Sequence, residues 1–128
     1  MRAVRSLVGV AILAAVFAGG VAVGQQTFGQ PKTVLHVVSG KWRAEASDEQ
    51  KQAALDGLKT MAGQVPGIKN IWVKPDRIQP REYNFAFAIE FESRAAADAY
   101  GEHPAHEEWY KLYLPIRAES RSLQLTNP

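Results

Sequence analysis

The sequence predicts an α+β fold of the ferredoxin-like type, in which a β-α-β-β-α-β chain forms a four-stranded antiparallel sheet with helices on one face. Three observations lead to this prediction. Residues 33–42 (TVLHVVSGKW) are rich in β-branched side chains, which favour a strand. Ser47 and Gln50 form a capping box that opens a helix with apolar residues at helical spacing. Residues 83–92 (YNFAFAIEFE) alternate large apolar with smaller or polar side chains, which is the two-residue period of a strand.

The other elements complete the order. The first helix is expected to stop at Pro66-Gly67, because proline cannot continue a helix and glycine favours a turn. Ser93 is expected to cap a second helix, and Pro104 suits the first turn of a third helical stretch. The remaining boundaries are a second strand over residues 68–74, the third helical stretch over about residues 104–117 and a last strand over about residues 119–126.

The N-terminus has the pattern of a secretory signal peptide. Arg2 and Arg5 give a positive start, residues 7–24 carry no charge, and small residues precede Gln25. We therefore expect cleavage at the end of this segment and export to the periplasm or beyond the cell. A retained membrane anchor is the alternative, since an apolar segment of this length nearly spans a bilayer. The expected boundaries are a leader over residues 1–24, a tether over residues 25–32 and a domain over residues 33–128.

Composition excludes several classes of protein. The 128 residues suit a single globular domain. The net charge of +2 comes from Arg2 and Arg5, so the chain beyond the leader is formally neutral and a nucleic-acid partner is not expected. Once the leader is cleaved, no contact with a membrane is expected either. The sequence has no cysteine, which excludes disulfides, thiolate metal sites and a cysteine nucleophile.

The predicted sheet is apolar on both faces, which indicates a homodimer. In the first strand Leu35 and Val37 oppose Val34 and Val38. A sheet with one face in water shows a cleaner alternation, so the second face needs a cover, and a second copy of the chain provides it. The second strand has the same character, with Ile71 and Val73 opposed to Ile68 and Trp72, and the third offers the small Ala86 and Ala88 for close approach.

Three histidines and one tyrosine are the main candidates for chemistry. His36 lies within the first strand, and His103 and His106 flank the start of the third helical stretch. The free N–H groups of a first helical turn disfavour a charged imidazolium, so His106 is expected to be a neutral imidazole that can act as a general base. Tyr100, six residues earlier, can polarise a carbonyl by hydrogen bonding.

Each of these residues also has a structural interpretation. His106 can be bonded to backbone at the start of a helix, His36 can be a satisfied core residue, and His103 can stabilise the turn. The spacing of His103, His106 and Glu107 is similar to a metal site, but Pro104 breaks the helical register that such ligands need. We therefore expect no metal.

The motifs around these residues resemble those of the stress-responsive A/B barrel (Dabb) family, which consists of dimeric α+β barrels. The resemblance covers about residues 34–125. It rests on the segments LHVV, VPGI, FAIEFES and AYGEHPAHEEWY, of which the last is the most specific. It implies a dimeric α/β barrel with a pocket between the sheet and the helices.

One characterised branch of this family is a plant polyketide cyclase, which closes a linear tetraketide by aldol condensation without metal or cofactor. Its base is the second His of the HPxH motif and a Tyr ahead of it helps to hold the substrate, which match His106 and Tyr100. The His of its first strand, matching His36, lines the same pocket. The cyclase has a further pocket histidine where this chain has Phe85, which argues against the same substrate. The resemblance makes His106 and Tyr100 candidate catalytic residues and makes His36, Phe85, His103 and Tyr110 candidate ligand-binding residues.

Three functions remain open, and the sequence does not decide whether the protein is an enzyme. The leading hypothesis is an exported homodimer that binds a small organic molecule. The second is a cofactor-free enzyme of lyase or cyclase type, in which His106 removes a proton next to a carbonyl while Tyr100 and His36 stabilise the oxyanion. The third is a related dimeric-barrel monooxygenase that acts on quinone-like substrates. None of the three implies a cofactor.

Overall fold

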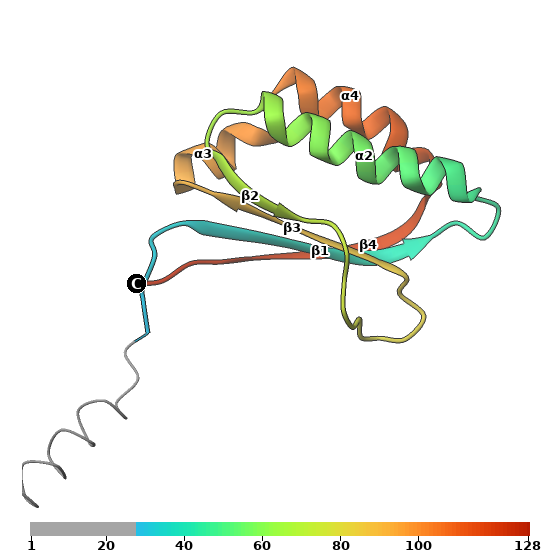
Figure 1. The fold of residues 1–128 in the computed structure, drawn as a ribbon, viewed down its shortest axis with the longest axis horizontal. Coiled ribbons are helices and arrows are strands. Elements are labelled where there is room, and N and C mark those ends of the chain that lie inside the picture. The colour runs from blue at the N-terminus through green and yellow to red at the C-terminus, as the bar shows by residue number, and fades with distance from the viewer. Residues whose placement is uncertain (1–27) are drawn as a thin grey trace, which may run out of the picture. The chain divides into compact units, whose positions relative to one another are not determined.

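The computed structural model describes residues 28–128, and residues 31–128 form one compact unit. Within it the chain forms one sheet and a layer of helices (Figure 1). The elements are β1 (Val34–Trp42), α2 (Asp48–Gln64), β2 (Ile68–Trp72), β3 (Phe85–Phe91), α3 (Arg94–Tyr100), α4 (Pro104–Tyr113), the 3-10 helix η1 (Leu114–Ile116) and β4 (Arg117–Leu125). The predicted β-α-β-β-α-β order is confirmed, with α3 and α4 together forming the second helical connection.

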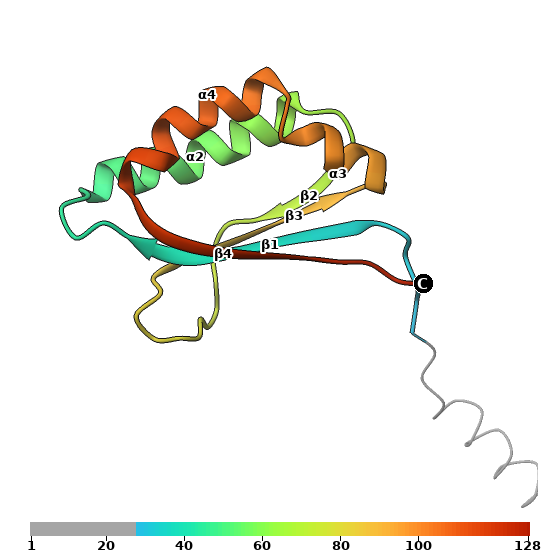
Figure 2. The same cartoon turned by 180° about the vertical axis from the view of Figure 1, so that it is seen from behind.

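The four strands form a single antiparallel sheet in the order β2-β3-β1-β4. Val38 in the central strand β1 lies opposite Phe87 of β3 and Ser122 of β4. Helices α2, α3 and α4 all cover the same face of the sheet, and the loop between β2 and β3 extends to the other side (Figures 1 and 2). This is the ferredoxin-like arrangement that the sequence predicts.

The helix boundaries follow from local chemistry. The Ser47 hydroxyl accepts a hydrogen bond from the Gln50 N–H while the Gln50 side chain accepts one from the Ser47 N–H, which confirms the capping box. Ser93 caps α3 by accepting from the Ala96 N–H. The helical stretch expected to reach residue 117 is shorter, because α4 ends at Tyr113 and continues only as a 3-10 turn that contains Pro115. Proline lacks the N–H that a further α-helical turn would need.

The core lies between the helices and the inner face of the sheet. Every second residue of the segment leading into and through β3 is buried there, as the alternation predicts: Tyr83, Phe85, Phe87, Ile89 and Phe91. Trp109 of α4 joins the helical layer together, since its indole N–H donates to the Ala54 carbonyl of α2 at 2.8 Å. Gly57 of α2 permits this close approach, because a Cβ there would lie 2.8 Å from the Leu112 side chain.

A β-bulge in β2 corrects one sequence expectation. Ile68 pairs with Phe91 and Ile71 pairs with Ile89, with the register shifting between them. Both isoleucines therefore face the core, whereas strict alternation would put them on opposite sides. Of the apolar residues in β2, Trp72 is the one that faces away from the helices, and half of its surface is exposed.

The outer face of the sheet is apolar and uncovered by any helix of residues 28–128 (Figure 2). Trp72, Leu123 and Leu125 are 50%, 53% and 57% exposed, and they are the large apolar side chains of this face that are most open to solvent. Leu35 and Val37 of β1 lie half-buried among them, opposite Leu125 and Leu123. The sheet thus has the two apolar faces that its sequence predicts.

The expected leader over residues 1–24 and the first part of the tether lie outside the described residues. From residue 28 onward, no helix combines the length and the apolar character needed to cross a membrane.

Candidate functional site

The HPxH motif builds the junction between α3 and α4. His103 is the N-cap of α4, and its Nδ1 accepts a hydrogen bond from the Ala105 N–H at 3.1 Å. Pro104 occupies the first helical turn, where its missing N–H costs nothing. The imidazole of His103 therefore caps the start of α4, which agrees with its structural interpretation as a residue that stabilises the turn.

His106 lies one turn further on and is enclosed by aromatic rings. It is 5% exposed, and its ring centroid is 4.0 Å from that of Tyr110 and 4.6 Å from that of Tyr100. Burial lowers the pKa of His106, the neighbouring His36 lowers it further, and Glu107 partly offsets this. The ring is therefore a neutral imidazole near neutral pH, which is the state a general base needs.

His36 faces the helices from the middle of β1, with its ring centroid 6.0 Å from that of Tyr100. Burial lowers the pKa of His36 as well. Its Nδ1 lies 3.5 Å from the Gln124 amide nitrogen, and Arg94 donates to the Gln124 amide oxygen at 2.8 Å. Because arginine can only donate, the amide oxygen faces Arg94 and the NH2 group faces the imidazole. His36 Nδ1 is then an acceptor, which places the proton of the neutral ring on Nε2.

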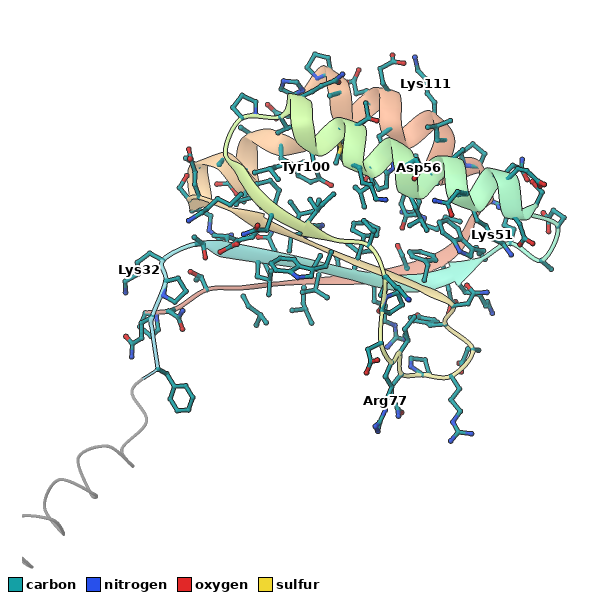
Figure 3. All side chains as sticks on the ribbon, in the orientation of Figure 1. Lys32, Lys51, Asp56, Arg77, Tyr100 and Lys111 are labelled. Atoms are coloured by element: carbon teal, nitrogen blue, oxygen red, sulfur yellow. The ribbon has the colours of Figure 1, made fainter. Side chains whose placement is uncertain are left out.

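Tyr100 ends α3 between these two histidines. Its side chain lies between the helical layer and the sheet (Figure 3), where its ring centroid is 5.0 Å from that of Phe91. Burial raises the pKa of the Tyr100 hydroxyl well above its ordinary range, and the nearby Tyr110 and Tyr113 add to the rise. The hydroxyl is therefore neutral at any physiological pH and able to donate a hydrogen bond.

A cavity of about 130 Å³ opens beside this cluster, between the inner face of the sheet and helices α3 and α4. Its walls combine aromatic rings with hydroxyl, imidazole and guanidinium groups. The residues that line it are His36, Val38, Phe87, Tyr100, Trp109, Tyr110, Tyr113, Arg117, Ser120 and Ser122. His106 does not line the cavity but touches three of the rings that do.

The cavity thus brings together some of the predicted site residues and leaves others out. His36, Tyr100 and Tyr110 line it, and His106 stands directly behind them. Phe85 does not, because it packs deeper in the core with its ring 4.2 Å from that of Trp42 and 5.7 Å from that of Tyr113. His103 is also outside, at the turn it caps.

Seven lining residues were not among the sequence candidates, and four of them carry a hydroxyl or guanidinium group: Tyr113, Arg117, Ser120 and Ser122. Burial raises the pKa of Tyr113, which the nearby Ser120 and Arg117 partly offset. Neither neighbour makes a hydrogen bond of good geometry to the Tyr113 hydroxyl, which is buried without a partner. The sequence of β4 could have predicted the two serines. Ser120 and Ser122 alternate with Leu123 and Leu125, so they face the opposite side of the sheet from these outward-facing leucines.

The site offers no evident place for a metal. Across residues 28–128, no three His, Asp or Glu side chains come together as a metal centre requires. The polar groups of the cavity suit an organic ligand, with hydrogen-bond donors set among aromatic walls.

The chain has a ferredoxin-like α+β fold, with a cavity lined by His36 and Tyr100 under the helices. The sequence matches the stress responsive A/B barrel domain, Dabb, over residues 34–126. The chain belongs to this family, and the resemblance noted from its motifs is confirmed. None of the curated proteins is a significant match to the sequence.

Several solved structures share this fold at low sequence identity. A dimeric ferredoxin-like protein of unknown function from Thermobifida fusca is 18% identical, with a TM-score of 0.66 over 80% of this chain and 97% of its own. Hydroxynitrile lyase from Passiflora edulis is 19% identical, with a TM-score of 0.65 over 74% of this chain and 93% of its own. A cofactor-independent oxygenase from Streptomyces nogalater is 9% identical, with a TM-score of 0.62 over 76% of this chain and 94% of its own.

Proposed function

We propose that the protein is a homodimer that binds a small organic molecule in the cavity between its sheet and helices. The observation that carries the proposal is the cavity itself, in which aromatic walls surround the polar groups of His36 and Tyr100. Apolar enclosure with a few convergent polar groups is the general character of a ligand site. The volume of about 130 Å³ is below the range of drug-sized pockets, which favours a ligand of few atoms.

The outer face of the sheet supports the dimer. Trp72, Leu123 and Leu125 would each leave water at an interface between two such faces, and burying a large apolar side chain contributes about 1.5–3 kcal/mol. Ala86 and Ala88 of the central strand β3 are small enough to let two sheets approach closely. The Thermobifida fusca neighbour is described as dimeric.

Ligand binding is testable with small aromatic carbonyl compounds as probes. Trp109 lines the cavity, so a bound probe should change its fluorescence and shift the amide resonances of His36 and Tyr100. Ser122→Trp should occlude the cavity from its exposed edge and abolish these changes, whereas Gln52→Trp on the exposed face of α2 should not. Binding that survives Ser122→Trp would place the ligand elsewhere and contradict the proposal.

A cofactor-free proton-transfer enzyme is the second candidate function. The supporting observation is that the imidazoles of His36 and His106, both with lowered pKa, have ring centroids 6.0 Å and 4.6 Å from that of Tyr100, whose hydroxyl is neutral. One imidazole would remove a proton from the carbon next to a carbonyl, and Tyr100 would donate a hydrogen bond to the oxyanion that forms. Two of the fold's neighbours, a hydroxynitrile lyase and a cofactor-independent oxygenase, are enzymes by name.

Exchange of α-protons separates the two candidates. A catalyst of this kind should speed the uptake of deuterium from D2O by simple aryl ketones, followed by NMR. His36→Ala and His106→Ala each remove one imidazole, so the base is the residue whose loss abolishes exchange. Equal exchange rates with the wild type, with both variants and without protein would contradict the enzyme.

We also propose that the protein is exported, on the basis of the leader over residues 1–24. Fractionation of cells that express the full chain, with N-terminal sequencing of the product, tests this. A mature N-terminus near residue 25 in the periplasm or medium supports export, whereas an intact leader in the membrane fraction supports the anchor.

A further inference from the structure

The hydroxyl of Tyr113 is a buried polar group without a hydrogen-bond partner within residues 28–128. Tyr113 is 2% exposed, and its Oη has no hydrogen-bond partner among the described residues. Buried hydroxyls without a partner are rare, because they lose their bonds to water and gain none in return. This hydroxyl belongs to the wall of the cavity, so a ligand is one means of satisfying it.

Arg117 places a positive charge over the Tyr113 ring in a cation–π contact, and this charge partly offsets the rise that burial causes in the pKa of the Tyr113 hydroxyl. Its guanidinium carbon lies 5.4 Å from the centroid of the Tyr113 ring. The ion pairs of the described residues join lysines to acids on α2 and α4, and none involves Arg117. The lining of the cavity contains no carboxylate, so Arg117 gives this wall a positive potential that nothing in it neutralises.

Strand β4 carries two serine hydroxyls on the same face of the sheet as Arg117. The residues of β4 in question are paired with residues of β1 as follows: Arg117 with Trp42, Ser120 with Gly40 and Ser122 with Val38. Trp42 and Val38 are buried in the core under the helices, so their partners in β4 face the same side of the sheet. A β-bulge opposite Lys41 and Trp42 shifts the register. Arg117 therefore faces inward with Ser120 and Ser122, although strict alternation would put residues three and five positions apart on opposite faces. The two serine hydroxyls and the guanidinium therefore line one wall of the same cavity.

We propose that Arg117, Tyr113, Ser120 and Ser122 form a carboxylate-binding subsite, and that the ligand of this protein is a small organic acid with an aromatic or carbonyl-bearing body. The guanidinium presents paired N–H groups that match the two oxygens of a carboxylate. The Tyr113 hydroxyl would donate to the same group, and Phe87 and Trp109 would contact the body of the ligand. The inference rests on the proposed function, because it names the class of molecule that the cavity takes.

Titration of the purified protein with three matched probes tests the subsite. Benzoate, benzamide and benzyl alcohol share one ring and differ in charge, and NMR shifts of cavity residues report the binding of each. We expect benzoate to bind about 10-fold or more tightly than the neutral probes, and Arg117→Gln to remove that preference. Tyr113→Phe should weaken benzoate binding without lowering the melting temperature, because it deletes a hydroxyl that has no partner. Arg43→Gln, an exposed arginine outside the cavity, is the charge-matched control and should leave all three affinities unchanged.

The possible results separate this inference from the proposed function. Equal binding of all three probes at the cavity, unaffected by Arg117→Gln, would overturn the carboxylate subsite and leave the binding function intact. Failure of all three probes to shift any cavity resonance at millimolar concentration would overturn both. Loss of benzoate binding in Arg43→Gln as well as in Arg117→Gln would show a general charge effect and would also overturn the subsite.

Discussion

The rings of Tyr100 and His106 lie nearly edge to face, with centroids 4.6 Å apart and an angle of 75° between their planes. One residue ends α3 and the other lies in the first turn of α4, so the contact closes the corner that Pro104 makes. Tyr100 also lines the cavity, and His106 packs against Tyr100 without lining it. The turn motif and the site are therefore a single structure.

Stability should fall as the solution becomes acidic, through His36 and His106. Burial lowers the pKa of both below the ordinary value of 6.5, so below that pH the unfolded chain binds protons that the folded chain resists. Their contribution is complete above about pH 6.5 and is lost progressively as the pH drops towards the folded-state pKa values. Urea unfolding across this range measures it. The double variant His36→Asn, His106→Asn should show a flatter dependence, and an unchanged slope would refute the assignment.

The tautomer of His36 should depend on Gln124. The Arg94–Gln124 hydrogen bond orients the amide so that its NH2 group meets Nδ1, which leaves the proton on Nε2. We expect the ¹⁵N shifts of the His36 ring to report mainly the Nε2–H form in the wild type and a mixture in Gln124→Leu. His103, whose Nδ1 accepts from the backbone of Ala105, is an internal reference and should not change. A wild-type ring protonated on Nδ1 would contradict the geometry.

Trp109→Phe should destabilise the fold. The substitution removes the buried hydrogen bond from the indole to the Ala54 carbonyl, and an unsatisfied buried partner costs about 1–3 kcal/mol, to which the smaller ring adds a packing loss. Chemical denaturation should therefore show a loss of about 2 kcal/mol or more. Tyr110→Phe on the same helix also removes a polar group from an aromatic ring, but at a half-buried position, and should change stability by less than about 1 kcal/mol. Similar losses for both variants would mean that the bond to Ala54 contributes little.

A charge on the outer face of the sheet should give a monomer. Leu123→Asp places a carboxylate within the apolar patch that we assign to the interface, where its desolvation would oppose pairing. Light scattering at micromolar concentration should show a dimer for the wild type and a monomer for this variant. Leu112→Asp introduces the same charge at an exposed leucine of α4, away from the sheet, and should remain dimeric. A monomeric wild type would remove the basis of the interface.

The backbone plan was predictable because local and global signals agree. The alternation through residues 83–91, the capping box at Ser47 and the cap at Ser93 each specify one element without knowledge of the others. The bulge in β2 was not predictable, because an inserted residue changes which side chains face the core without leaving a local mark in IKNIW. Strict alternation therefore misplaces Ile68.

The site was predictable only in part, for a related reason. His36, Tyr100 and Tyr110 line the cavity, and strand phase and helix position, which fix where they face, can be read from the sequence. Phe85 and Phe87 both face the helices, but only Phe87 lines the cavity. The strand alternation gives the face of the sheet, but it does not tell which helix lies above each residue. Arg117 escaped notice because a register shift in β4 turns it inward, and such shifts are set by pairing with β1.

The sheet side of the cavity comes in part from β1 and from its hydrogen-bonded neighbour β4, so the first and last strands of the domain must pair before this side is complete. During synthesis, β4 is the last of the strands to leave the ribosome, so its part of the cavity wall is added last. A nascent or truncated product that lacks residues 117–125 would therefore lack Arg117, Ser120 and Ser122, and with them the subsite that we propose.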